Sequence, residues 1–528
     1  MVPISLASPA AGIEQALVFL LIIAAAVAVV ARRVGVPYII GLVLVGLVVG
    51  LALHLDSLRL SSDLVFYVFL PILLFEGAYN LEATLLRDQW RRIAVLALPG
   101  VFVAFGLTAV GVHVLGGLAW SVALLFGALI AATDPVSVVS LFRKLGVSER
   151  LTTLVDAESL FNDGAAAVLF AVVVAVVVDG RAFSAGWAVG AFLWMSIGGV
   201  AVGFAVGYGA SWLHRRLDDH LIEITLSTIV AYGSFLLAQS LGMSGVVACV
   251  TAAIILGNLG RRRTMNPVTR VTLTTVWDFA AFIANSLIFL LIGLSVKLEL
   301  ILDNVGIVFV AFFVVLAARA VTVYGFGALA RLFRTGPPLS WQHVLVWGGL
   351  RGTIALALVL SVPAAATGRS ELVTVTFGVV LLSLLVQGLT MPWLTRRLGL
   401  AGQARSAGER DRELLLDGFV RAHEELEKLE DAGVVGRVER RHLEQVLDAG
   451  ETSVLEGLPP LADEPDRGED DRLVERIGEL VGQRRRVEAL RRGGALAGDA
   501  AAIVRTDLDG RIVLLAGRLD DAGGPGTA

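Results

Sequence analysis

The stretch Asp156-Ala-Glu-Ser-Leu-Phe-Asn-Asp-Gly164 puts carboxylates into the middle of an apolar segment that is long enough to cross a membrane as a helix. Glu158 and Asp163 lie within it, and Asp134 interrupts the apolar segment before it. An ionised carboxylate buried in lipid costs several kcal/mol, so three carboxylates at similar depth require an explanation. The pattern indicates a site where cations lose their water and bind, with protons as competitors.

The composition is that of a membrane protein with a soluble tail. Of 528 residues, 56% are hydrophobic and 17% are charged, and the mean hydropathy is +0.78, which is too apolar for a soluble protein of this length. The apolar excess ends near residue 400, and residues 401–528 hold 28 acidic and 19 basic side chains. We therefore expect a transmembrane domain over residues 1–397 and a charged, partly helical tail over residues 398–528.

Thirteen apolar segments are candidates for transmembrane helices, which need about 20 apolar residues each. Basic residues alternate between the loops: one set of loops holds 18 Lys and Arg, and the other set holds four. Because basic loops stay in the cytoplasm, we expect a multi-pass protein of the plasma (inner) membrane with its N-terminus outside and its tail in the cytoplasm. The predicted spans are residues 13–31, 37–54, 63–80, 93–116, 120–142, 151–178, 185–212, 221–241, 243–260, 271–296, 301–330, 340–362 and 372–395.

Two pairs of polar residues share faces of the sixth span. Glu158 and Asn162 are four residues apart, as are Ser159 and Asp163, and this spacing places each pair on one face of a helix. Hard cations bind oxygen ligands of these kinds, and the carboxylates can also take a proton. A buried polar cluster that only locks helix packing is the alternative, but the density of polar groups favours an ion site.

Two other spans carry helix-breaking sequences. In the fifth span, Thr133-Asp134-Pro135 contains a proline, which removes a backbone donor and clashes with the preceding turn. In the twelfth, Gly348-Gly349-Leu350-Arg351-Gly352 sets three glycines around a charge. Interrupted backbone inside a membrane must be buried in protein or line a cavity. We therefore expect carbonyls freed at the first break, with the Thr133 hydroxyl, to complete a sodium shell; a simple kink at Pro135 is the alternative.

The two predicted breaks are seven spans apart. If spans 1–6 and 8–13 are repeats, the breaks are symmetry mates, and the odd offset makes the repeats inverted in topology. Interrupted helices at matching positions of inverted halves point to the binding site of a secondary transporter. The sequence shows no clear internal repeat, so this expectation rests on the number of spans.

Arg319 lies between alanines in the eleventh span and needs an anion if it is buried in lipid. Glu158, Asp134 and Asp163 are the candidate partners. Glu158 is preferred, because this choice leaves Asp163 free to titrate. The alternative is that the Arg319 side chain snorkels to an end of its span.

Five motifs, taken together and in this order, resemble those of a known family. They are Thr-Asp-Pro (133–135), Glu-Ser-Leu-Phe-Asn-Asp-Gly (158–164), Ala-Asn-Ser-Leu-Ile-Phe-Leu-Leu-Ile-Gly (284–293), Gly-Gly-Leu-Arg-Gly (348–352) and Val-Gln-Gly-Leu-Thr (386–390). Over about residues 13–400 the chain resembles the monovalent cation:proton antiporters of the CPA1 type, the NhaP- and NHE-like sodium–proton exchangers. The tail does not share this resemblance.

The resemblance implies an all-α homodimer with two bundles in each protomer. Spans 4–6 and 11–13 would form a moving core, in which the broken helices 5 and 12 cross. Spans 1–3 and 7–10 would form the scaffold on the dimer side.

The resemblance also implies roles for single residues. Asp163 matches the carrier of the ion and the proton. Thr133, Ser159 and Asp134 match its neighbours, and the expected sodium ligands are Asp163, Thr133 and Ser159. Asn162 stands where electrogenic relatives have a second aspartate.

Further roles are expected for charges and for helix breaks. Glu158 matches the acid that pairs with an arginine of span 11, which is Arg319 here. Arg351 is expected to be a second structural charge partner. The expected helix-breaking residues are Pro135, Gly348, Gly349 and Gly352.

These expectations describe a secondary active antiporter that exchanges one sodium ion for one proton, electroneutrally and by alternating access, with both competing for Asp163. Its expected role is sodium transport and pH homeostasis. Potassium–proton exchange is the competing interpretation and lithium a further candidate ion, because oxygen ligands serve all three. A cation channel and a non-transport membrane scaffold are the rival classes. We expect no enzyme activity, cofactor or nucleic-acid partner; the expected partners are Na⁺, H⁺, the lipid bilayer and a second copy of the chain.

Overall fold

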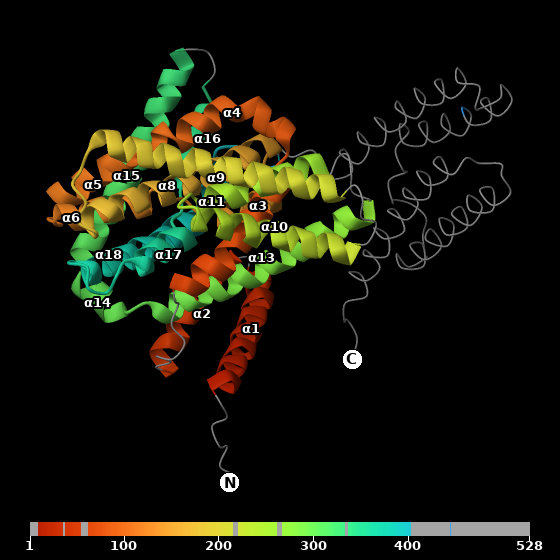
Figure 1. Ribbon diagram of the computed structural model, residues 1–528. Helices are drawn as coiled ribbons and strands as arrows, with labels where there is room; N and C mark the ends of the chain where they lie inside the picture. Colours follow the sequence, from red (N-terminus) through yellow and green to blue (C-terminus); the bar gives the residue numbers. More distant parts are fainter. Residues whose placement is uncertain are drawn as a thin grey trace, which may run out of the picture. The chain divides into compact units, whose positions relative to one another are not determined.

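The structure is a computed structural model that describes residues 9–34, 37–53, 62–214, 220–260, 267–332, 336–402 and residue 444. The chain divides into two compact units, residues 1–405 and 406–528, of which the first is described here. The described residues of this unit form helices and connecting segments, with no strand among them (Figure 1). The predicted helical tail, from residue 403 on, lies outside the described residues apart from Glu444.

Helices follow one another closely along the chain. The N-terminal half contains α1 (Pro9–Val34), α2 (Tyr38–Leu53), η1 (Leu64–Phe69), α3 (Leu70–Asn80), α4 (Ala83–Ala97), α5 (Pro99–Val114), α6 (Trp120–Ile130), α7 (Val136–Leu145), α8 (Glu149–Val177), α9 (Ala185–His214), α10 (His220–Ser240), α11 (Gly245–Ile255) and η2 (Leu256–Gly260). The C-terminal half contains α13 (Pro267–Ser295), α14 (Leu298–Asp303), α15 (Val305–Leu332), α16 (Leu339–Trp347), α17 (Thr353–Ser361), α18 (Arg369–Leu382), η3 (Ser383–Gly388) and α19 (Leu389–Arg397). The elements η1, η2 and η3 are π-helical stretches.

Seven helices in the described part of the chain are long and apolar enough to cross a membrane. They are Ala83–Val114, Glu149–Val177, Ala185–His214, Leu221–Ser240, Thr272–Ser295, Val305–Arg331 and Arg369–Arg397. Shorter apolar helices lie at Val18–Ala31, Tyr38–Ala52, Leu64–Asn80, Trp120–Ile130 and Gly245–Leu259. Every one of the thirteen predicted ranges overlaps a described helix.

The fourth predicted range begins too late. Its helix starts at Ala83, ten residues before the predicted start, and runs as α4 to a bend at Leu98 and Pro99. The α4 sequence carries Arg87, Asp88 and Arg91 on an exposed face, so a search for apolar runs passes over it. The apolar face of α4 packs against α8, which explains why the charged segment is helical.

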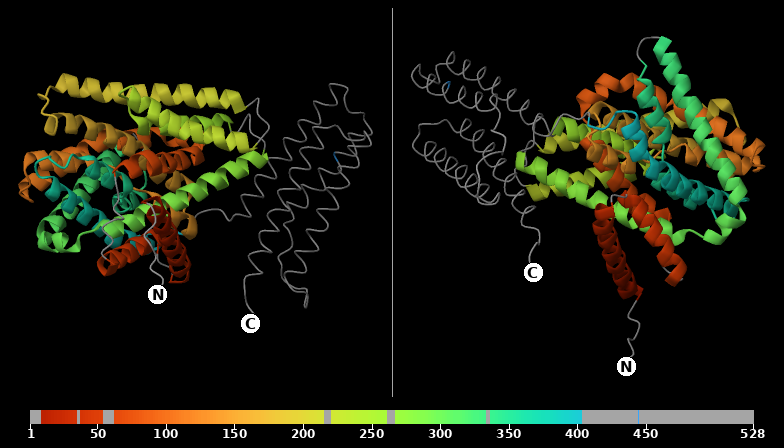
Figure 2. Two further views of the ribbon diagram at one scale, coloured as in Figure 1. Left: turned by 60° about the horizontal axis from the view of Figure 1, so that its bottom comes forward. Right: turned by 180° about the vertical axis from the view of Figure 1, so that it is seen from behind.

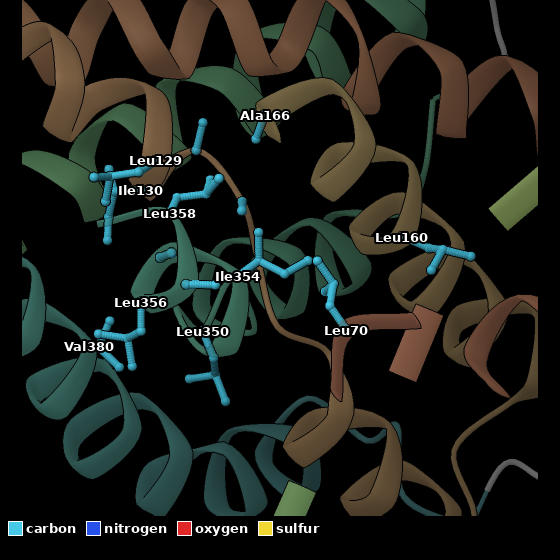
Figure 3. Packing of buried hydrophobic residues seen from close by; sticks show 14 of the residues in the cluster. Leu70, Leu129, Ile130, Leu160, Ala166, Leu350, Ile354, Leu356, Leu358 and Val380 are labelled. Carbon is cyan, nitrogen blue, oxygen red and sulfur yellow. The ribbon is translucent and has the colours of Figure 1, made fainter. Parts of the chain in front are cut away.

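Both segments that were predicted to be interrupted are interrupted in the structure. Residues 131–135 separate α6 from α7, and residues 348–352 separate α16 from α17. The two interruptions touch: the backbone N–H of Asp134 donates to the carbonyl of Leu350 over 2.8 Å. The helices that flank the two interruptions also pack on each other, and Figure 3 shows Leu129 and Ile130 of α6 close to Leu358 of α17.

Close backbone contact joins α2 to α13, which lie side by side in Figures 1 and 2. A Cβ on Gly46 would overlap the carbonyl oxygen of Leu290 and lie 3.1 Å from the Cα of Gly293. A Cβ on Gly293 would lie 2.8 Å from the backbone N of Leu47. Glycine is therefore required on both sides, as is common where helices within a membrane pack closely.

We predict that Gly46→Ala lowers the melting temperature of the purified protein by several degrees, because the added methyl group pushes α2 away from α13. Overpacking of this kind typically costs about 1–3 kcal/mol. Gly106→Ala in α5 is the matched control, since nothing lies within 4 Å of its added Cβ and alanine favours a helix over glycine by about 1 kcal/mol. Equal melting temperatures for the two variants would contradict the packing described here.

Candidate ion-binding site

Residues 156–164 lie within α8, an unbroken helix of 29 residues. Four polar residues of this helix are buried: Glu158 is 1% exposed, Ser159 2%, Asn162 3% and Asp163 7%. Their spacing puts them on adjoining faces of one helix. Each polar group here must therefore find a partner inside the protein or in a bound ion.

Glu158 is paired with Arg319 of α15. The guanidinium donates two hydrogen bonds to the carboxylate, Nη1 to Oε1 over 2.7 Å and Nη2 to Oε2 over 2.8 Å. Arg319 Nε donates to the carbonyl of Leu345 over 3.2 Å. A Cβ on Gly349 would lie 3.0 Å from Arg319 Nε, so this glycine leaves room for the guanidinium. Of the three candidate anions, Glu158 is therefore the one that pairs with Arg319, and the two charges neutralise each other.

The first interruption brings Thr133 against α8. Its hydroxyl donates to Ser159 Oγ over 3.0 Å and accepts a hydrogen bond from Asn162 Nδ2 over 3.2 Å. Three of the residues predicted to form the ion site therefore lie in one hydrogen-bonded group. This group depends on the helix being open after Ile130, because only non-helical backbone turns Thr133 toward α8.

Asp134 serves the ends of two helices. Its Oδ1 accepts from the backbone N–H of Val136 in the first turn of α7 over 3.1 Å. Its Oδ2 accepts from the backbone N–H and the hydroxyl of Thr353 at the start of α17, each over 3.4 Å. Negative charge is favourable at both positions, because helix N-termini carry unpaired N–H groups and a positive partial charge. A Cβ on Gly352 would collide with this carboxylate.

Arg351 serves the end of another helix. Its Nη1 donates to the carbonyls of Ala131 (3.0 Å) and Ala132 (2.9 Å), just beyond the last residue of α6. The C-terminus of a helix carries unpaired carbonyls and a negative partial charge, which a cation stabilises. Two carbonyls that were expected to be available to sodium are thus bound to an arginine. The backbone N–H of Arg351 donates to Ser383 Oγ over 3.2 Å.

The helix-breaking residues lie where the sequence predicted the breaks. Pro135 immediately precedes α7, Gly348 follows α16, and Gly352 immediately precedes α17. Sequence reasoning missed Thr353 and Ser383, which are ordinary polar residues whose partners lie in other elements. Only the position of Thr353 directly after a glycine-rich break could have marked it as the first residue of a helix.

Asp163 differs from the other two carboxylates. Among the described residues, its Oδ1 has no hydrogen-bond partner, and neither has Oδ1 of the adjacent Asn162. An unpartnered buried acceptor is rare in folded proteins and calls for a bound ion, water or proton. The Asp163 carboxylate has a hydrogen bond with the backbone of Thr133, but it forms no ion pair with a described lysine or arginine.

A cavity of about 80 Å³ adjoins Asp163. At roughly 30 Å³ each, it has room for two or three water-sized species. On its apolar side, Figure 3 shows Ile354 of α17 and Leu70 of α3 pointing toward each other. Its polar lining residues are Glu76, Thr133, Asp134, Asp156, Asp163 and Thr353. Carboxylate and hydroxyl oxygens at a water-sized space fit a hard monovalent cation.

Fold and site together define a class. Seven of the described helices are long and apolar, two predicted spans are interrupted where they touch, and a cavity lined by four carboxylates lies at that contact. This is the arrangement expected of a polytopic membrane protein with a polar site inside its apolar core.

Comparison with known proteins identifies the family. The family model described as "Sodium/hydrogen exchanger, transmembrane" matches residues 17–397. The chain is 42% identical over 370 residues to the Na(+)/H(+) antiporter ApNhaP of Aphanothece halophytica, covering 70% of each chain. It is 39% identical over 372 residues to the low-affinity Na(+)/H(+) antiporter NhaS1 of Synechocystis, again covering 70% of each. The chain therefore belongs to the sodium/hydrogen exchanger family, as its motifs indicate.

A solved structure shares the fold. The sodium proton antiporter MjNhaP1 from Methanocaldococcus jannaschii superposes with a TM-score of 0.61, covering 73% of this chain and 98% of that one. The two sequences are 20% identical, so this likeness concerns the arrangement of the helices.

We predict that Glu158→Gln destabilises the protein strongly, because it leaves the Arg319 charge buried and unpaired. Breaking a buried pair in this way typically costs about 3–5 kcal/mol. The double variant Glu158→Gln/Arg319→Gln is expected to melt at a higher temperature than either single variant, since it leaves no unpaired charge. Thermal unfolding of the purified proteins measures this cycle, and strictly additive losses would show that the pair is not coupled.

Proposed function

We propose that this chain is a secondary active antiporter that exchanges Na⁺ for H⁺ across the plasma membrane. Membership of the sodium/hydrogen exchanger family supports the class of reaction, and relatives that cover most of the chain are named as Na(+)/H(+) antiporters. The observation that carries the proposal is local. Asp163 is buried beside a cavity with an unpartnered oxygen, whereas Glu158 and Asp134 have partners within the protein.

Asp163 is the proposed carrier of both ions. A carboxylate can hold a proton covalently or a sodium ion electrostatically, and a small cavity does not favour both at once. The moving core of spans 4–6 and 11–13 would swing between the two faces of the membrane only when Asp163 is neutralised by one or the other. An empty, ionised site would have to carry an uncompensated charge through a region of low dielectric constant, which is unfavourable. This restriction couples the two fluxes.

The proposed sodium ligands are Asp163, Thr133 and Ser159, with Asn162 beside them. The unpartnered Oδ1 atoms of Asp163 and Asn162 supply two oxygens that need an electropositive neighbour. The hydroxyls of Thr133 and Ser159 lie 3.0 Å apart in the same group, and a hydroxyl can turn its lone pair toward an arriving cation. Potassium and lithium also bind oxygen ligands, so the assay below compares all three ions.

One-for-one exchange follows from the charges. Asn162 is neutral, Glu158 is neutralised by Arg319, and Asp134 lies at two helix N-termini throughout. One carboxylate is then left to alternate between sodium and a proton. The net charge that crosses is the same in both directions, and the cycle is electroneutral.

The proposed setting is a homodimer in the plasma membrane with thirteen spans in each protomer. Helices in all thirteen predicted ranges support the number of spans. The loop charges support an external N-terminus and a cytoplasmic tail. Spans 1–3 and 7–10 would form the dimer-side scaffold, and spans 4–6 and 11–13 the moving core.

We predict that Asp163→Asn abolishes exchange and leaves the fold intact, because an amide can neither bind a proton at neutral pH nor neutralise a cation. Fluorescence dequenching in everted vesicles, with sodium, lithium and potassium compared, measures exchange. Asp303→Asn, which removes an exposed acid from α14, is the control and should behave as the unaltered chain. The melting temperature of the Asp163→Asn protein should not fall. Exchange at a normal rate in this variant would exclude Asp163 as the carrier.

A further inference from the structure

The cavity beside Asp163 is strongly acidic. Four carboxylates line it, and its lining contains no Lys, Arg or His. The two buried arginines nearby are bound elsewhere, Arg319 to a carboxylate of α8 and Arg351 to carbonyls beyond α6. The four acids are Glu76, Asp134, Asp156 and Asp163.

Three of these four acids are accounted for by a partner within the protein or by the proposed transport role. Asp134 accepts hydrogen bonds at two helix ends, and Asp163 is the proposed carrier. Glu76 of α3 accepts a hydrogen bond from Asn80 Nδ2 over 3.0 Å. Asp156 is held by no hydrogen bond or ion pair among the described residues; it interacts through space with Glu76 and with the exposed Arg143. Its carboxylate is therefore available to a mobile cation.

The position of Asp156 on α8 is also informative. It precedes Asp163 by seven residues, which is two helical turns on one face and a rise of about 10 Å. It therefore lies between Asp163 and the loop from Arg143 to Arg150, which the charge bias of the loops places in the cytoplasm. A cation that enters the cavity from that side passes Asp156 before it reaches Asp163.

We propose that Asp156 is a cation-capture residue, which holds an incoming monovalent cation at the cytoplasmic side of the cavity before the cation moves to Asp163. The inference rests on the proposed antiport and adds a residue that sets the affinity for the cation. Asp156 carries the same charge before and after the cation passes, so it leaves the stoichiometry unchanged. The second observation that points to a ligand is Asp163 Oδ1, which is buried, unpartnered and part of the same cavity wall.

The size of the effect follows from Coulomb attraction. One unit charge about 10 Å away, at an effective dielectric constant of about 20, changes the local concentration of a monovalent cation by roughly tenfold. Acidic walls of low dielectric constant concentrate cations in this way. Removal of the Asp156 charge should therefore raise the sodium concentration that gives half-maximal exchange and leave the maximal rate unchanged.

The experiment measures sodium-driven exchange in everted vesicles, in which the cytoplasmic face meets the medium. The assay is run at about pH 8.5, which is several units above the ordinary carboxyl pKa of about 4. Asp156→Asn should raise the half-saturating sodium concentration about threefold to tenfold, whereas Asp156→Glu should restore the unaltered value. Glu149→Gln is the matched control: it removes one exposed acid from the same end of α8, outside the cavity lining, and should change nothing.

A dependence on ionic strength separates capture from a structural role. Raising the ionic strength with choline chloride from about 10 mM to about 300 mM shortens the screening length from about 30 Å to about 6 Å. The difference between Asp156→Asn and the unaltered chain should then shrink. If the asparagine variant does not accumulate, Asp156→Ser replaces it in the same assay. Binding of radioactive sodium to the purified proteins then compares the sodium affinity of the variant with that of the unaltered chain.

Two results would overturn the inference. The first is an unchanged half-saturating concentration in Asp156→Asn, and the second is a lower maximal rate with unchanged half-saturation, which indicates a structural role. Either result leaves the proposed antiport in place as long as the unaltered chain exchanges sodium. Absence of sodium-driven exchange in the unaltered chain would overturn the proposed function and the capture role together.

Discussion

Two interrupted helices inside an apolar core can persist only if each satisfies the backbone groups that the other leaves open. An unpaired N–H or carbonyl in a membrane interior costs several kcal/mol. Here the N–H of Asp134 bonds to the Leu350 carbonyl, and Arg351 bonds to the carbonyls of Ala131 and Ala132. The Asp134 carboxylate also accepts hydrogen bonds from the backbone N–H and the hydroxyl of Thr353. The site exists because this mutual bonding holds open, non-helical backbone beside α8.

Most buried charges of the core have partners near the two interruptions. Glu158 pairs with Arg319, Asp134 accepts hydrogen bonds at helix N-termini, and Arg351 donates hydrogen bonds at a helix C-terminus. Each of these charges has a partner within the protein. Asp163 is the carboxylate that lacks such a partner at Oδ1. In the proposed mechanism, ion binding and stability therefore depend on different acids of a single buried cluster.

The sequence predicts much of this arrangement, because its signals are local. Proline and clustered glycines mark the interruptions, and a buried arginine requires a buried acid. The choice of Glu158 for Arg319 agrees with the contact in the structure. The roles of Asp163, Ser159 and Thr133 in binding sodium stay predictions.

Other features could not be predicted, because they depend on contacts between distant segments. Nothing in the sequence around Thr353 points to Asp134, which is 219 residues away. The start of α4 at Ala83 was missed because its charged face hides a helix that is stabilised by packing on α8. Glu76, Asp134 and Asp156 come from separate segments of the chain and line the same cavity. The positions of these residues in the sequence do not show that they lie close together.

If one carboxylate alternates between sodium and a proton, the rate of exchange should not respond to the membrane potential. In proteoliposomes, a potassium gradient with valinomycin imposes a potential, and sodium-driven proton movement is recorded on either side of zero. One net charge moved across the membrane would couple to the potential by about 2.3 kcal/mol per 100 mV. With a single exchanging carboxylate, the rate should not change over about 100 mV of either sign. A rate that changes several-fold with the sign of the potential would contradict it, because a second charge would then have to cross with each cycle.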